Sequence, residues 1–190
     1  MNNQTTIEIH KGQRDNFRRM KSLLTCVSND PTREVIRYVS VEKDGDGILV
    51  IGTDGRRLRT DRFEINTDAG LYEIKANTAQ TIYLTKSELG LNFPNWKQIV
   101  PSTDSCDAYA FIGHGKRFVL WVTAGLGCYI DPELIALNDY EDVTLYVQKL
   151  RPDLAPAVMQ NETTTFVVMP YRVTEKWGQD LESIRNAKAA

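Results

Sequence analysis

Two turn signals rich in aspartate and glycine divide the first third of this chain into short runs of β-branched residues. Asp44-Gly45-Asp46-Gly47 lies between runs at 35–41 and 48–51, and Asp54-Gly55 lies between 48–51 and a further run at 57–65. The commonest tight hairpin turn needs a positive φ at both central residues, which Gly, Asn and Asp adopt most readily. The sequence therefore predicts two successive β-hairpins, and with them an antiparallel sheet.

Further apolar runs extend this strand-rich pattern toward the C-terminus. We expect strands at 72–76, 81–85, 109–112, 118–123, 143–147 and 165–173. The turn-forming segment 113–116 is expected to join 109–112 to 118–123, and a proline-bearing loop is expected before the last strand.

Helices are predicted at three places. Over 14–28, apolar residues recur every three or four positions and form one buried stripe, Phe17, Met20, Leu24 and Val27. Asp131-Pro132-Glu133 combines an N-cap aspartate, a proline at the first helical position and an acidic first turn, so a short helix is expected through about Asn138. Over 174–190, a third stripe predicts a C-terminal amphipathic helix, Trp177, Leu181 and Ile184.

The first predicted helix also carries a row of basic residues beside its apolar stripe. Its members follow one another at helical spacing, Lys11, Arg14, Arg18 and Lys21. Like charges on one helix face repel, so this row does not serve helix stability. Either the row contacts an anion such as nucleic-acid phosphate, or it is an ordinary solvated face. The predicted helix at 131–138 has no basic residue and would add nothing to a basic surface.

Length and composition describe an ordinary soluble globular chain. Its 190 residues suffice for one well-buried core, and 42% are hydrophobic and 25% charged. The sequence has no apolar run of bilayer length and no signal-peptide pattern at its start, so we expect a cytoplasmic protein without membrane contact. A formal net charge of −2 argues against coating nucleic acid through bulk positive charge, although local basic patches remain compatible with it.

The motifs of catalysis and metal binding are missing from the sequence. The two histidines, His10 and His114, are isolated, and no nucleophile elbow, P-loop or dinucleotide-binding glycine pattern occurs. Cys26, Cys106 and Cys128 are widely spaced, which indicates neither a disulfide framework nor a zinc site. We expect no catalytic residues, no metal and no cofactor.

Three short segments, far apart in the chain, carry a resemblance to one known family. They are TDGRRL at 53–58, FPNWKQIVP at 93–101 and FVVMPYRV at 166–173. Taken singly, each reads as a hairpin turn, an extended connector or a buried strand. Together and in this order they resemble a TDGHRL-like turn, an FPDYRRVLP-like connector and a terminal VVMPMRL-like strand of the bacterial β sliding clamp, the ring-shaped processivity factor of DNA polymerase III.

The resemblance covers most of residues 11–173 and implies an α+β fold. We expect a DNA-clamp-like unit with two helices packed on one side of an antiparallel sheet. The part through the connector resembles the middle clamp domain, and the part from Gly127 resembles the end of the last domain, so the resemblance implies a shortened clamp-like protein. We expect one domain at 1–173, with an insertion over about 103–125, followed by the extra helix at 174–190.

In the family, these three segments form the pocket where short motifs of polymerases and repair proteins dock. Carried over position by position, the docking residues of this chain are Thr53, Gly55, Arg56, Leu58, Pro94, Ile99, Val167, Met169 and Pro170. Arg56 stands where the family commonly has histidine, which leaves the ligand preference open. Replacing Leu58 or Met169 by alanine is expected to weaken peptide binding and leave the fold intact. The competing interpretation is that these apolar residues are simply core.

The resemblance implies a non-enzymatic protein that docks clamp-binding peptides of DNA polymerase or repair proteins. Because the first helix of a clamp unit faces the DNA, it also implies phosphate contacts by the basic row. A ring built from chains of this length would require a homo-oligomer. One alternative is a monomeric or dimeric adaptor or decoy that keeps the pocket but does not encircle DNA. A second is an enzyme with an unrecognised carboxylate cluster.

Overall fold

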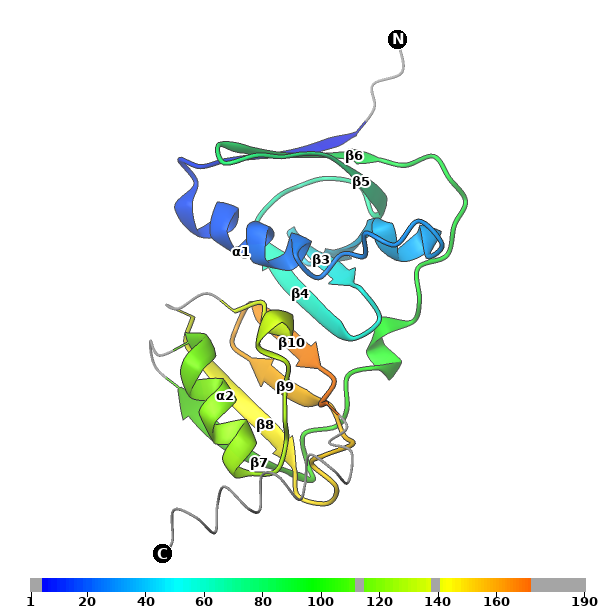
Figure 1. Ribbon diagram of the computed structural model, residues 1–190. Coiled ribbons are helices and arrows are strands. Elements are labelled where there is room, and N and C mark those ends of the chain that lie inside the picture. Colours follow the sequence, from blue (N-terminus) through cyan, green and yellow to red (C-terminus); the bar gives the residue numbers. More distant parts are fainter. Residues whose placement is uncertain (1–4, 112–114, 138–140, 172–190) are drawn as a thin grey trace, which may run out of the picture.

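The computed structural model describes residues 5–111, 115–137 and 141–171. These residues form one ten-stranded sheet with two α-helices in front of it (Figure 1). The strands are β1 (Thr6–His10), β2 (Val39–Asp44), β3 (Gly47–Thr53), β4 (Arg57–Phe63), β5 (Gly70–Asn77), β6 (Thr81–Lys86), β7 (Cys106–Phe111), β8 (Val143–Gln148), β9 (Ala157–Gln160) and β10 (Thr164–Val168). The helices are α1 (Arg14–Leu24) and α2 (Gly115–Gly125), and short 3₁₀ turns occur at η1 (Glu34–Arg37), η2 (Trp96–Gln98) and η3 (Pro132–Leu134).

Neighbouring strands of the sheet pair antiparallel in the order β1-β6-β5-β2-β3-β4-β10-β9-β8-β7. Both predicted hairpins are confirmed as β2–β3 and β3–β4, with Gly45 and Gly55 at positive φ in their turns. The pairing of β4 with β10 joins the N-terminal strands to the C-terminal ones, with Val167 opposite Leu58 and Thr164 opposite Asp61.

Helix α1 packs on the N-terminal strands as its apolar stripe predicts. The four stripe residues are all buried, Phe17, Met20, Leu24 and Val27. The helix ends at Leu24 rather than at 28, and Cys26 and Val27 continue in a turn that is still buried. The predicted α+β fold, two helices on one side of an antiparallel sheet, is confirmed.

The second helix lies at a different place from the one predicted. The segment 118–123, predicted as a strand, belongs to α2, which lies in front of β8 (Figure 1). Its β-branched and aromatic residues favour a strand locally. However, Val119 and Thr123 are both fully buried one helical turn apart, and Leu126 packs against the same cluster, so tertiary packing overrides that preference.

The helix predicted at 131–138 is wrong beyond its first turn over the described residues 131–137. Asp131 does cap the 3₁₀ turn η3, because its side chain accepts a hydrogen bond from the Glu133 amide at 2.9 Å. The following residues are buried one after another, which no amphipathic helix allows, Leu134, Ile135, Ala136 and Leu137. Backbone carbonyls that would continue a helix instead accept hydrogen bonds from Arg57 and Arg59.

Two strands were not predicted, and several expected segments differ in their bounds. β1 at the sheet edge and the short β9 carried no clear signal, while 34–37 is η1, so β2 begins only at Val39. The segment expected as an insertion contributes β7 and α2, and β7 pairs with β8 along its length. The helix predicted at 174–190, the end of the last strand at 172–173 and most of the turn at 113–116 lie outside the described residues.

Side chains along β4 and β10 alternate between the two faces of the sheet. Arg59 and Asp61 lie on the face covered by the helices, together with Thr164. Leu58 and Val167 point to the other face. There they form a small core cluster with Ile51 and Val158, against which Phe93, Trp96 and Val100 of the connector pack.

Candidate functional site

The three segments that carry the resemblance meet around one small pocket beside the β4–β10 pair. Its volume is about 60 Å³, and it is lined by Thr53, Gly55, Arg56, Arg57, Leu58, Ile99, Val167 and Met169. Leu58 and Val167 are 1% and 2% exposed and form its floor, whereas Ile99 and Met169 are 42% and 41% exposed at its rim. The pocket thus has an apolar floor and two large apolar side chains open to solvent.

The turn between β3 and β4 is held by a local hydrogen-bond network. The Asp54 carboxylate accepts from the backbone amides of Arg56 and Arg57 at 2.9 and 3.1 Å. The Thr53 hydroxyl accepts from the Gly55 amide at 3.1 Å and donates to the Arg57 carbonyl at 2.7 Å. Because Gly55 has a φ of 88°, which glycine adopts without steric cost, the turn closes tightly.

The last strand is fixed to this turn by one backbone hydrogen bond. The amide of Met169 donates to the carbonyl of Arg56 at 3.0 Å, just beyond the end of β10. The β3–β4 turn therefore fixes the backbone from which the Met169 side chain extends. The β3–β4 turn and the end of β10, which lie more than a hundred residues apart, thus form adjoining sides of the pocket.

The connector at 93–101 forms the third side of the pocket. Trp96 of η2 packs on the Leu58–Val167 cluster and donates its indole N–H to the Glu42 carboxylate of β2 at 2.7 Å. The Ile99 amide then closes the short turn on the Trp96 carbonyl at 3.0 Å. These contacts hold Ile99 at the pocket while leaving its side chain exposed.

The structure places most of the predicted docking residues at this pocket, but not all. Pro94 is exposed on the connector and Pro170 is half-buried after β10, and neither lines the cavity. Arg57 also lines the cavity, although it is not among the predicted docking residues. It belongs to the TDGRRL segment, but its position is fixed by contacts that the local sequence does not reveal. Its guanidinium donates to the backbone carbonyls of Glu133 and Leu134, each at 2.9 Å.

The expectation that Leu58→Ala would leave the fold intact is contradicted by the burial of this side chain. Leu58 belongs to the core cluster with Ile51, Val158 and Val167, where truncation leaves a cavity. For Leu58 and Val167, the core and docking interpretations therefore both apply: the residues form the floor of the pocket and part of the core. Ile99 and Met169 are the members that face solvent.

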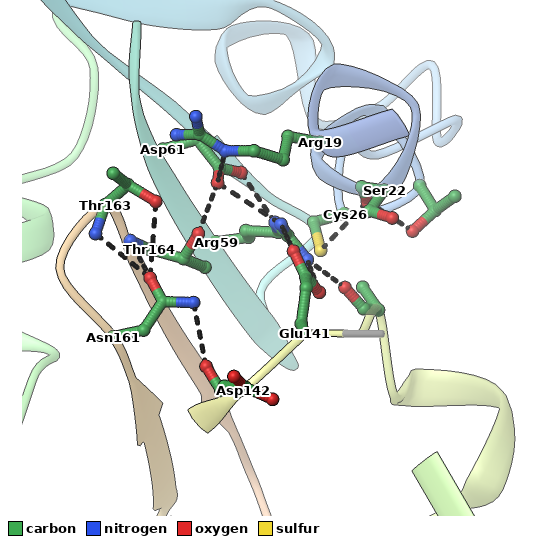
Figure 2. Close-up of polar contacts among 12 residues, drawn as sticks. Arg19, Ser22, Cys26, Arg59, Asp61, Glu141, Asp142, Asn161, Thr163 and Thr164 are labelled. Carbon is green, nitrogen blue, oxygen red and sulfur yellow. Dashed lines mark hydrogen bonds and ion pairs between the residues drawn. The ribbon is translucent and has the colours of Figure 1, made fainter. Parts of the chain in front are cut away.

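On the opposite face of the sheet, a buried cluster of charges joins the two parts of the molecule (Figure 2). Arg59 and Asp61 are fully buried, and the Arg59 guanidinium contacts Asp61 at 2.6 and 3.2 Å. It also contacts Glu141 at 2.5 and 3.2 Å. Asp61 further accepts from the Thr164 hydroxyl at 2.6 Å and from Arg19 of α1 at 3.2 Å.

The charges of this cluster balance each other among the residues that the structure describes. Burial by itself lowers the pKa of Arg59, but the charges of Asp61 and Glu141 and their hydrogen bonds reverse this effect and raise it above its ordinary value. Two arginines and two carboxylates cancel, and the Arg59 guanidinium also donates to the Ala136 carbonyl. A buried charge is tolerated only when it is paired in this way.

Arg14, Arg18 and Lys21 of the basic row lie on α1, whereas Lys11 lies in the turn before the helix begins, so the predicted row of four on one helix is wrong at Lys11. Lys11, Arg14 and Arg18 are exposed and Lys21 is half-buried. Arg18 forms an ion pair with Asp15 at 2.6 Å, and the Lys21 ammonium lies 5.5 Å from the centroid of the Phe17 ring. Asp15 therefore reduces the net positive charge of this helix face by one unit.

The described residues show no arrangement typical of catalysis or metal binding. They contain no group of three or more His, Cys, Asp or Glu side chains that could hold a metal. Burial raises the pKa of the Cys26 thiol to about 12 and that of Cys128 to about 11, so neither is a reactive thiolate near neutral pH. No helix in the described part of the chain is long and apolar enough to cross a membrane.

Comparison with known proteins identifies the fold through structure alone. No protein-family model matches the chain, and no curated protein matches its sequence. Among solved structures, the sliding clamp of Pseudomonas aeruginosa aligns with a TM-score of 0.56 at 11% identity, over 89% of this chain and 67% of the clamp.

Two further clamps give the same result. The putative DNA polymerase III β subunit of Eubacterium rectale aligns with a TM-score of 0.58 at 11% identity, over 88% of this chain and 66% of that protein. The Bacillus subtilis clamp aligns with a TM-score of 0.56 at 12% identity, over 92% and 66%. The chain thus matches about two thirds of each clamp's length, and it has the fold of the bacterial DNA polymerase III β sliding clamps.

Proposed function

We propose that this chain is a non-enzymatic, clamp-like protein that docks short peptide motifs of replication or repair proteins in the pocket beside the β4–β10 pair. One observation carries the proposal. Three segments far apart in sequence converge on a small apolar pocket whose rim, Ile99 and Met169, is exposed. Short linear motifs bind through two or three apolar anchors in such clefts, and an adaptable methionine at the rim suits varied anchors.

Titration of a labelled peptide, glutamine followed by leucine and phenylalanine anchors, tests the proposal by fluorescence anisotropy. We expect Met169→Ala to weaken binding by about 1–3 kcal/mol, because the side chain that is removed forms part of the rim and not of the core. Leu150→Ala removes an apolar side chain that is 84% exposed and outside the pocket, so this control should bind like the wild type.

Urea unfolding of the same variants separates docking from packing. Met169→Ala should unfold close to the wild-type midpoint, whereas Leu58→Ala should lose about 2–5 kcal/mol because it opens a cavity in the core. If the wild type does not bind the peptide, and Met169→Ala alters stability alone, the pocket is only core packing.

Contact with duplex DNA is a second candidate function, favoured by the position of the two helices. α1 and α2 lie on the same side of the sheet (Figure 1), and Arg14 and Arg18 on α1 are exposed. The acidic segment after Asp131 is not the second helix. The first turn of α2 instead contains Lys116, which is half-buried, and no acidic residue. Phosphate contacts from both helices would bind duplex DNA without reading its sequence.

Charge reversal on α1 tests this second function. Arg14→Glu with Arg18→Glu should weaken binding to any duplex about equally and should flatten the log–log salt dependence by roughly one unit for each phosphate that is no longer bound. Lys75→Glu with Lys149→Glu changes the net charge equally on exposed strand and turn residues outside the helices, so it serves as the control. Absence of duplex binding by the wild type at low salt excludes the DNA function.

The adaptor alternative shares the pocket and differs in assembly. A chain that spans about two thirds of a clamp subunit encircles DNA only as a ring of several copies. The molar mass measured by light scattering distinguishes the ring from the adaptor. A ring requires a closed multimer, whereas a monomer or compact dimer favours an adaptor or decoy that captures the same peptides.

A further inference from the structure

A second, polar cavity adjoins the apolar pocket across the β3–β4 turn. Its volume is about 450 Å³, and it lies between that turn and the segment that follows α1. Arg56 and Arg57 line both cavities, which makes them the boundary between an apolar and a polar compartment. The polar cavity also contains Arg33, Asp30 and Asp54, so its formal charge is positive by one unit.

Within the part of the chain that the structure describes, four of these five charged groups are engaged in ion pairs or side-chain hydrogen bonds. Arg57 pairs with Asp54 at 3.0 Å and donates to three backbone carbonyls. Arg33 donates to the Asp54 carbonyl at 3.0 Å and lies 3.8 Å from Asp30. Asp30 accepts hydrogen bonds from the side chain and backbone of Thr32, which lower its pKa. These groups build the wall of the cavity and are not available to a ligand without rearrangement.

Arg56 combines a fixed backbone with an exposed side chain. Its backbone is fixed on both sides, since its amide donates to Asp54 at 2.9 Å and its carbonyl accepts from Met169 at 3.0 Å. Both of these hydrogen bonds are backbone contacts, and the side chain is exposed. A permanently charged guanidinium is therefore anchored at the rim of the apolar pocket, on the same residue that positions Met169.

We infer that the peptide docked in the apolar pocket carries an aspartate or glutamate beside its apolar anchor, and that this carboxylate pairs with Arg56 over the polar cavity. The inference rests on the docking function proposed above and specifies its ligand. Charge complementarity supports it: the cavity next to the anchor is net positive, and Arg56 lines both compartments with an exposed side chain. A guanidinium binds carboxylates through paired hydrogen bonds that an amide does not match.

The test uses peptides that share the glutamine, leucine and phenylalanine anchors and differ at one flanking position. Glutamate is placed in turn at each of the two positions before and the two positions after the anchors, with glutamine at the same position as the uncharged comparator. Binding to the wild type, Arg56→Gln and Arg62→Gln is measured at low and at high salt. Arg62 is a half-exposed arginine toward the other end of β4, so it controls for net charge.

At one of these positions, glutamate should bind the wild type about two- to fivefold more tightly than glutamine, as expected for a partly exposed ion pair. The gain should disappear in Arg56→Gln, persist in Arg62→Gln and shrink at high salt. Equal binding of glutamate and glutamine peptides at every position, or a gain that survives in Arg56→Gln, would overturn the inference while leaving the docking function in place. Failure of all of these peptides to bind the wild type would instead reject docking itself.

Discussion

Asp61 accepts hydrogen bonds from three different elements of the fold. Its partners are Arg59 on the same strand, Arg19 on α1 and Thr164 on β10. Through Arg59, the cluster extends to Glu141, 82 residues further along the chain. A single carboxylate thus helps to hold the N-terminal and C-terminal parts of the sheet together at the β4–β10 pair.

Removal of this carboxylate should be costly. Asp61→Ala leaves the Arg59 guanidinium buried with only part of its compensation, so we expect a loss of about 3–5 kcal/mol in the free energy of unfolding. Glu73→Ala breaks an exposed ion pair with Lys75 on β5 and should change stability far less. Urea denaturation of both variants measures the difference. A loss for Asp61→Ala no larger than that of Glu73→Ala would show that the buried cluster does not stabilise the fold.

Local signals in the sequence predict only part of the site at the residue level. Leu58, Ile99, Val167 and Met169 were assigned through the three-segment resemblance, and they line one pocket. The buried pair on β4 was not predicted, because charged residues two apart on a strand give no sign of burial. Their partners Glu141 and Thr164 are 82 and 103 residues away from Arg59 and Asp61 respectively. The β4–β10 register brings Thr164 to Asp61, whereas Glu141 lies just before β8.

Among the elements, the β3–β4 hairpin connects fold and site most directly, because its turn forms one wall of both cavities. Asp-Gly turn chemistry predicted the hairpin from sequence, and the structure adds the reason for its rigidity in the bonds from Asp54 and Thr53. Gly55 is required here for its φ of 88°.

Substitution of Gly55 tests the importance of this turn. Gly55→Ala forces a side chain into the left-handed region and should destabilise the fold by about 1–2 kcal/mol. The added Cβ would lie 2.5 Å from an Arg33 nitrogen, but the end of that flexible side chain can move, so the backbone strain dominates. Gly90→Ala is the control, since its Cβ meets nothing within 4 Å. Thermal unfolding compares them, and equal midpoints would contradict the role assigned to the turn.

Element prediction failed where tertiary contacts decide the conformation. The strand-like composition of 118–123 hid a helix that buries Val119 and Thr123 on one side. The helix start at Asp131 was correct for one turn, but the following backbone carbonyls are taken by arginines of β4 instead of by a helix. In both segments the determining partners lie on other elements, which a local pattern does not reveal.

At the scale of the whole molecule, the chain resembles about two thirds of a bacterial clamp subunit in fold and little of it in sequence. The hairpin, connector and last strand nevertheless meet as the resemblance implied. Because the floor of their pocket is core and its rim is exposed, we propose that the rim is a docking surface for peptides.

The methionine methyl groups offer the most direct test of this claim. Met169 is 41% exposed at the pocket, whereas Met20 and Met159 are fully buried in other parts of the core and serve as internal controls. In NMR spectra of methyl-labelled protein, addition of the clamp-binding peptide should shift the Met169 resonance, assigned through Met169→Leu, and leave the Met20 and Met159 resonances in place. A Met169 resonance that does not move at saturating peptide, or equal shifts at all three methionines, would contradict docking at this pocket.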